Sequence, residues 1–210
     1  QKSGEPFTDE MVKAAADLID ADYIAVHLNF LQEVIQPEGD RCGAGIRDRI
    51  RDLALRYPII VKETGAGIDG YTAERLKGIG VRGLDIAGMG GTSFSAVEMY
   101  RASMIGDDAL AEMGNTFFDW GIPAPAALAE CRASRLPLIA SGGILDGTHV
   151  AAAVAMGAEA AGVAHAVLRE ATESADAVKK KLMLFREELR AAMMLTGSAN
   201  IKQLAEARHF

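Results

Sequence analysis

The sequence predicts an α/β fold, a TIM (β/α)8 barrel of which this chain carries about the last five βα units. Short apolar runs alternate with helical patterns five times along the chain. Each run is almost continuously apolar, which is typical of strands that are buried on both faces of a parallel sheet. Polar residues follow each run, at the carboxyl ends of the strands, where barrels place their chemistry.

The elements can be placed from hydrophobic period and capping residues. The predicted strands are residues 22–28, 58–63, 83–88, 136–141 and 160–167. The predicted helices are 7–21 (capped by Thr8, with Met11, Val12, Ala15 and Ile19 at helical spacing), 46–55, 71–78, 123–134, 147–156 and 173–195, with a short one after Gly197. Residues 94–119 are expected to be part helix and part loop.

A barrel is favoured over a doubly wound sheet because the chemistry is spread over five strand ends. A doubly wound sheet concentrates its site at one switch point. Five strands cannot close a barrel, which typically needs about 250 residues. We therefore expect residues 1–210 to be a single barrel domain that lacks about three N-terminal βα units, and Gln1 to follow further chain. The strand-end residues are His27, Asn29, Lys62, Glu63, Asp85, Ser141, Ala164 and His165.

Composition narrows the function classes. The 210 residues are 50% hydrophobic and 24% charged, as in a soluble globular protein. The net charge of −7 argues against a general binder of nucleic acid or of anionic membranes. Cys42 and Cys131 lack metal-like spacing, so they are expected to be free thiols in a reducing cytoplasm. We find no apolar run of membrane-spanning length and no signal-peptide pattern.

Three glycine-rich stretches each follow a predicted strand, at 62–70, 87–94 and 141–147. Glycine lets backbone N–H groups approach an anion, and a following helix N-terminus adds positive potential. A plain turn explains any one of these loops equally well. All three together at strand ends favour an anion site, because the loops after the last two strands of a barrel commonly bind phosphate.

Two side chains within these loops are candidate cofactor ligands. Lys62 ends its strand and could hold an anion or the edge of a flavin ring through charge-assisted hydrogen bonds, or it could be an ordinary surface lysine. The hydroxyl of Thr92 could donate to a ring or to a phosphate, or it could equally cap the next helix.

The stretch "HLNFLQEVIQPEGD" (27–40) carries the most concentrated polar chemistry. His27 and Asn29 are two residues apart on a strand and share a face, while Gln32 and Glu33 are expected in the loop above. Carboxylates are hard oxygen ligands, and Mg²⁺ typically takes one or two of them together with substrate phosphates. The alternative is a solvated acidic loop that caps the helix at 46–55.

These motifs together resemble a known family. "HLNFLQEVIQPEGD", "KETGAGID", "DIAGMGGTSF", "FFDWGIP", "SGGILDG" and "AMMLTG" occur in the order found in the type 2 isopentenyl diphosphate isomerases. The first motif is specific to that family, whereas the glycine loops are shared with other FMN barrels. The resemblance implies interconversion of isopentenyl and dimethylallyl diphosphate with reduced FMN, Mg²⁺ and NADPH as the usual reductant, in the cytoplasm and in a homo-oligomer, a tetramer or octamer.

The resemblance also implies roles for particular residues. Gln32 would act at the reacting carbons, Glu33 would hold Mg²⁺, and His27 and Asn29 would line the substrate diphosphate site. The implied FMN contacts are Lys62, Thr92, Gly143, Ile144, Leu145, Ala164 and His165.

Two departures from the family pattern leave other functions possible. Leu145 stands where the family commonly has arginine, and His165 replaces a more usual residue. An FMN-dependent 2-hydroxy-acid oxidase or dehydrogenase would need a histidine base near an arginine, and residues 116–135 offer Arg132 and Arg135 but no histidine. A further alternative is a barrel remnant without catalytic activity.

Overall fold

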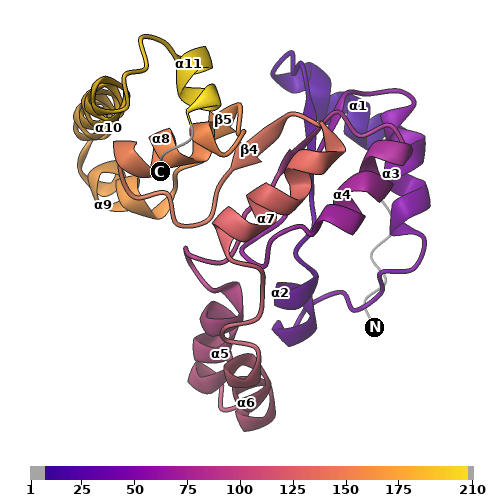
Figure 1. Ribbon diagram of the computed structural model, residues 1–210. Helices are drawn as coiled ribbons and strands as arrows, with labels where there is room; N and C mark the ends of the chain where they lie inside the picture. The colour runs from indigo at the N-terminus through magenta and orange to yellow at the C-terminus, as the bar shows by residue number, and fades with distance from the viewer. Residues whose placement is uncertain (1–7, 208–210) are drawn as a thin grey trace.

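The computed structural model describes residues 8–207, so the expected N-terminal loop and Phe7 lie outside the described residues. Five parallel strands form one sheet in the order β1-β2-β3-β4-β5 (Figure 1). Strands that follow one another in the chain are neighbours in the sheet, as in the wall of a barrel, and this confirms the α/β prediction of a partial barrel. The strands are β1 (Ile24–His27), β2 (Ile59–Lys62), β3 (Gly83–Asp85), β4 (Leu138–Ala140) and β5 (Ala160–Ala161).

Helices connect successive strands and continue beyond the last one. They are α1 (Asp9–Leu18), α2 (Phe30–Ile35), α3 (Ile46–Ala54), α4 (Gly70–Gly78), α5 (Phe94–Met104), α6 (Asp108–Thr116), α7 (Ala124–Cys131), α8 (Gly147–Ala155), α9 (His165–Glu173), α10 (Ala175–Leu195) and α11 (Ile201–Glu206), with a 3₁₀ turn η1 (Arg132–Ser134). The prediction that 94–119 is part helix and part loop is confirmed by α5 and α6.

The main core lies between one face of the sheet and the helices α3, α4 and α7 (Figure 1). Its centre is formed by fully buried side chains of the strands, among them Ile59, Val61, Leu84 and Leu138. A smaller cluster joins α8 to α10 and α11 through Ala151, Val154, Ala192 and Leu204. Both clusters are apolar, so the burial of hydrocarbon surface fixes helices against the strands in the first cluster and against one another in the second.

The expectation that every strand is buried on both faces is wrong. Burial alternates in β1, where Ile24 and Val26 pack against the core while Ala25 and His27 are exposed. It alternates likewise in β2 and β4. The strands present one side to the helices, and the other side faces the concave surface of the sheet, which a closed barrel would fill with side chains.

The segment 160–167 also differs from the prediction, which made it one strand. Only Ala160 and Ala161 pair with β4, and α9 begins at His165. A short apolar run cannot be assigned to strand or helix from its period alone. The single helix predicted at 173–195 is in fact α10, which starts at Ala175 after the extended residue Ser174 that caps it.

Several helices start at the polar residues that the sequence marks. Thr8 accepts a hydrogen bond from the N–H of Met11 at 3.3 Å and caps α1, as predicted. Ser93 caps α5, so Thr92 is not the capping residue of that helix. The explanation of Thr92 as the cap of this helix is therefore excluded.

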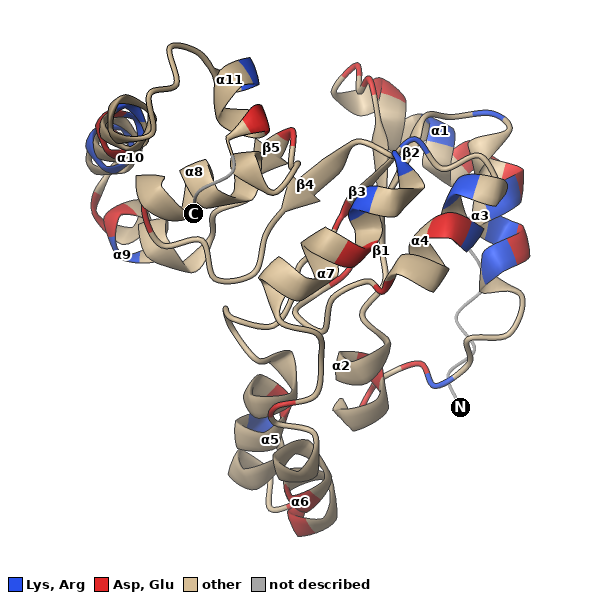
Figure 2. Ribbon diagram, in the orientation of Figure 1, with Lys and Arg blue, Asp and Glu red and all other residues tan. Residues whose placement is uncertain are grey.

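Charged side chains of both signs are interspersed on the surface. On α3, Arg51 pairs with Asp48 at 3.0 Å, and Figure 2 shows basic and acidic residues side by side on this helix. Cys42 and Cys131 are both free thiols, as predicted. Among the described residues, no helix is long and apolar enough to cross a membrane.

Two glycine loops pack backbone against backbone at the carboxyl ends of β3 and β4. A Cβ at Gly142 would lie 1.9 Å from the carbonyl oxygen of Gly88, and one at Gly143 would lie 2.5 Å from that of Gly90. Gly142 also has a φ of +91°, which residues with a side chain rarely adopt. These glycines are therefore required by the fold itself, in addition to any ligand.

We expect Gly142→Ala to lower the free energy of unfolding by more than about 2 kcal/mol, because the clash is with backbone and adds to the cost of a positive φ. Gly78→Ala is the control, since a Cβ there has no neighbour within 4 Å and the position lies in a helix. It should be neutral or stabilising by about 0.5–1 kcal/mol. Urea unfolding measures both, and equal effects of the two variants would contradict the packing argument.

Candidate functional site

A cavity of about 600 Å³ lies at the carboxyl ends of the strands. Its walls are the three glycine loops and the segment between β5 and α9. This volume lies in the range of sites for cofactors and drug-sized ligands. The lining includes all seven residues that the family resemblance assigns to FMN, namely Lys62, Thr92, Gly143, Ile144, Leu145, Ala164 and His165.

Lys62 provides a positive charge at the wall of this cavity. It ends β2 and is the register partner of Asp85 on β3, which also lines the cavity. Asp85 accepts a hydrogen bond from the hydroxyl of Ser141, and that hydroxyl accepts one from the N–H of Ala87 at 3.1 Å. Parallel pairing thus gathers a cation, a carboxylate and a hydroxyl from three strand ends, where they can bind a polar ligand.

Glu63 organises the glycine loop after β2, a role that the sequence did not indicate. One carboxylate oxygen accepts hydrogen bonds from the N–H groups of Thr64, Ala66 and Gly67, at 2.5, 2.6 and 3.1 Å. Burial raises the pKa of Glu63, and the backbone donors oppose that rise by stabilising the charged form. The side chain of Glu63 therefore fixes the loop that forms one wall of this cavity.

The N-terminus of α9 is available to an anion, whereas that of α8 is not. Asp146 caps α8 by accepting hydrogen bonds from the N–H groups of Thr148 and His149, at 2.8 and 3.0 Å. The residue at the start of α9 is Ala164, and no side chain caps the helix there. Ala164 and His165 line the cavity, so the amides of the first turn can bind a phosphate group.

Leu145 is half exposed at the edge of the cavity, and its N–H donates to Nδ1 of His149 at 3.2 Å. The N–H of Leu145 is thus already paired within the protein, whereas the resemblance implies that Leu145 contacts FMN. The apolar side chain offers no charge to a phosphate, so Gly143, Ile144 and the start of α9 remain the candidates for that contact.

His27 lies at the end of β1, and its Nε2 is 2.8 Å from the hydroxyl of Thr64. Partial desolvation of the ring lowers the pKa of His27 and the positive charge of Lys62 lowers it further, while Asp85 and Glu33 oppose the shift. The imidazole is therefore neutral at pH 7, and it can donate a hydrogen bond to a phosphate but adds no positive charge. His27 lies on the exposed face of β1 outside the 600 Å³ cavity.

Gln32 and Glu33 lie on α2, and the expectation that they lie in a loop is wrong. The strand ends at His27, and the chain turns into a helix at Phe30 after Asn29. A single turn of helix places residues three and four apart on one side. Asn29, Gln32 and Glu33 therefore come within hydrogen-bonding distance of one another, which a free loop would not ensure.

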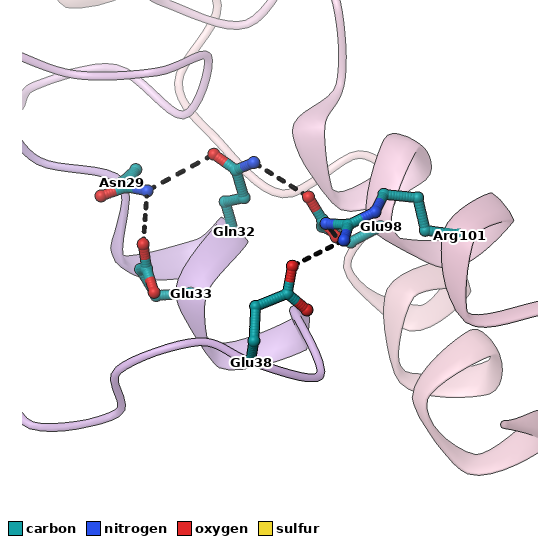
Figure 3. A network of polar contacts seen from close by, with 6 residues as sticks. All are labelled: Asn29, Gln32, Glu33, Glu38, Glu98 and Arg101. Atoms are coloured by element: carbon teal, nitrogen blue, oxygen red, sulfur yellow. Dashed lines mark hydrogen bonds and ion pairs between the residues drawn. The ribbon is translucent and has the colours of Figure 1, made fainter. Parts of the chain in front are cut away.

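A directed chain of hydrogen bonds connects these residues (Figure 3). Nδ2 of Asn29 donates to Oε1 of Glu33 at 2.9 Å and to Oε1 of Gln32 at 3.4 Å. Nε2 of Gln32 donates to Oε1 of Glu98 at 2.9 Å. Ionised carboxylates only accept, so a carboxylate at each end fixes which way both amides point.

Glu98 and Arg101 on α5 were not identified from the sequence. Glu98 is 1% exposed, and Arg101 contacts both its carboxylate and that of Glu38, each at 2.6 Å. A Glu and an Arg three residues apart usually form a surface pair on a helix, so the sequence carries no signal that this glutamate is buried. Figure 3 shows the pair beside α2, facing Gln32.

Glu33 can serve as a single metal ligand. Oε1 accepts from Asn29 and Oε2 accepts from the N–H of Asp40 at 2.7 Å, so the carboxylate is fixed in place. Residues 8–207 contain no group of three or more His, Cys, Asp or Glu side chains that could hold a metal. The donor set therefore fits Mg²⁺ only when a ligand such as a diphosphate supplies most of the oxygens.

A second cavity of about 470 Å³ adjoins the first. The two share the glycine-loop walls, including Thr92. Aromatic and aliphatic residues of α2, α5 and the chain after α6 form part of the second lining, together with the glycine loops and with polar residues that include Glu63 and Asp119. These residues include Asn29, Leu31, Gln32, Phe94, Val97, Tyr100, Phe118 and Trp120.

Comparison with known proteins shows the family to which this chain belongs. The model of the FMN-dependent dehydrogenase family matches residues 48–209. The chain therefore belongs to the FMN-dependent dehydrogenase family. Solved structures support the same fold: a lactate oxidase of Pediococcus acidilactici has a TM-score of 0.68 at 15% identity over 95% of this chain and 56% of its own. A mandelate oxidase has a TM-score of 0.63 at 19% identity, with 92% and 57% covered.

Curated relatives carry a more specific name. The isopentenyl-diphosphate delta-isomerase of Halobacterium salinarum is 48% identical over 95% of this chain and 56% of its own length. Those of Thermoplasma acidophilum and Picrophilus torridus are 46% and 40% identical, over 90% and 100% of this chain and 54% and 60% of their own lengths. The resemblance inferred from the motifs is confirmed, and the chain spans little more than half the length of these relatives.

The ion pair between Glu38 and Arg101 predicts a pH effect. The guanidinium lowers the pKa of Glu38 from its ordinary 4.5 to about 2. The pair stabilises the fold at pH above 4.5, and this stabilisation is lost as the pH falls toward 2. The stability difference between wild type and Glu38→Gln should therefore shrink on acidification, as measured by urea unfolding at pH 7 and 3. A difference that is constant over this range would contradict the assignment.

Proposed function

We propose that this chain contributes the flavin-binding and reaction-centre parts of an isomerase that interconverts isopentenyl and dimethylallyl diphosphate, with reduced FMN and Mg²⁺ as cofactors and NADPH as the reductant. One observation carries the proposal. The amide of Gln32 lines a cavity that shares a wall with the cavity of the FMN-assigned residues. The names of the relatives that are 40–48% identical support the same activity.

The first cavity fits FMN in size and in chemistry. Lys62 places a cation where a flavin ring edge or an anion would lie, and the uncapped start of α9 suits the phosphate. Thr92 contributes a hydroxyl to the same wall. When bound, reduced FMN would supply an electron-rich ring that stabilises positive charge and exchanges a proton.

The second cavity suits a small branched hydrocarbon. Its walls include Leu31 together with Phe94, Phe118 and Trp120, whose aromatic rings would stabilise a developing tertiary positive charge. The amide of Gln32 lies among these apolar groups in a fixed orientation. A neutral amide is a poor acid, so its proposed part is to position the reacting groups for proton transfer.

The diphosphate is proposed to bind beside α2. Glu33 would hold Mg²⁺ together with diphosphate oxygens, while neutral His27 and Asn29 would donate hydrogen bonds. The activity as a whole is proposed for a protein of the length of the relatives, of which this chain spans little more than half. We further propose that residues 1–210 form one domain, that the protein works in the cytoplasm, and that it is a homo-oligomer, a tetramer or octamer. The exposed apolar residues Leu184, Met194 and Leu195 of α10 support an assembly surface.

Lys62→Met should weaken FMN binding by about tenfold or more, because it removes a charge-assisted hydrogen bond worth about 1.5–3 kcal/mol. Lys77→Met on the exposed side of α4 is the matched control and should bind FMN as wild type does. Titration followed by flavin fluorescence measures both affinities. Equal affinity of the two variants would remove Lys62 from the proposed flavin site.

Gln32→Ala in the full-length protein should lower kcat by about a hundredfold or more, within the range of a lost positioned proton-transfer group. FMN affinity should change little, because Gln32 lines only the second cavity. The assay supplies isopentenyl diphosphate, Mg²⁺, FMN and NADPH and measures dimethylallyl diphosphate. Full activity of the variant would exclude Gln32 from the reaction, and absence of product from the wild type would overturn the proposed function.

A further inference from the structure

Arg101 connects the surface of the molecule to the reaction-centre amide. It lies on α5, with its side chain 45% exposed, and its guanidinium spans two carboxylates. Nη1 donates to Oε2 of Glu98 and Nη2 donates to Oε1 of Glu38, both at 2.6 Å. Both bonds are short and charge-assisted, which makes them stronger than neutral ones.

Arg101 holds one carboxylate oxygen of Glu98, which leaves the other oxygen to accept a hydrogen bond from Gln32. The carboxylate is 1% exposed, with Oε1 bound to Gln32 and Oε2 bound to Arg101. A buried carboxylate that loses its ion-pair partner rearranges, because burial penalises an uncompensated charge. A rearranged Glu98 would no longer accept from Nε2 of Gln32, and the amide of Gln32 would then be free to turn its oxygen toward α5.

Such a turn would conflict with the other end of the chain of hydrogen bonds. Asn29 presents its NH₂ group to Oε1 of Gln32, since the same NH₂ donates to Glu33. A reversed Gln32 would place its own NH₂ against that donor. Glu98 at one end and Glu33 at the other therefore set the direction of the hydrogen bonds between α5 and α2 (Figure 3).

We propose that Arg101 is a positioning residue, which holds the Glu98 carboxylate in place as the acceptor for Gln32 and thereby fixes the orientation of the Gln32 amide. Glu38, in the loop after α2, holds the guanidinium from the other side and ties that loop to α5. The inference rests on the proposed function of Gln32. It gives "QPEGD" a purpose that does not depend on metal binding, because Glu38 acts through Arg101.

Arg101→Met in the full-length protein should lower kcat at least about tenfold, with the KM for isopentenyl diphosphate and the affinity for FMN within about twofold of wild type. Arg101→Lys keeps the charge and should recover part of the kcat. Arg190→Met on α10, where the arginine also pairs with a glutamate, is the matched control and should leave kcat unchanged. Unchanged kcat in Arg101→Met, or no recovery in Arg101→Lys, would overturn the proposal.

A second readout is independent of activity. The side-chain amide signal of Gln32 can be assigned in ¹H–¹⁵N spectra as the one missing from Gln32→Ala. It should exchange slowly with solvent in wild type and Arg101→Lys, and at least about tenfold faster in Arg101→Met, because its acceptor is lost. Equal exchange in all three overturns the positioning role. If the wild type fails to isomerise while this pattern holds, only the proposed function falls.

Discussion

The parallel register of the sheet is the constraint on which the site depends. It sets His27, Lys62 and Asp85 side by side at the ends of β1, β2 and β3. Because parallel strands all end at the same edge, loops distant in sequence meet there. The glycine loops then pack backbone to backbone, as Gly142 does against Gly88, so that the cavity walls are part of the folded core rather than added to it.

The polar groups of the site are held by one another rather than by solvent. Glu63 is fixed by three backbone N–H groups, and Glu33 by Asn29 and the N–H of Asp40. Buried polar groups that are fully hydrogen-bonded specify one arrangement, whereas partly bonded ones do not. Glu98 directly, and Glu33 through Asn29, fix the orientation of the Gln32 amide, so this neutral side chain is preorganised.

Strand ends and glycine loops made much of this site predictable from sequence. Lys62 and Thr92 were identified because their places after apolar runs determine where they face. Residues 160–167 were misassigned because a short apolar run has no period that separates strand from helix. Glu98 was missed because its burial is set by α2, a segment 66 residues away, and by Arg101 that neutralises it. Contacts of this kind are tertiary and leave no local pattern.

We propose that an FMN-dependent barrel of the dehydrogenase family performs an isomerisation without net oxidation. The most direct measurement incubates the full-length protein with isopentenyl diphosphate and Mg²⁺, with FMN either oxidised or chemically reduced under anaerobic conditions. We expect dimethylallyl diphosphate to form only with reduced FMN, with no stoichiometric loss of reduced flavin. Absence of isomerisation together with flavin reduction by 2-hydroxy acids would contradict it.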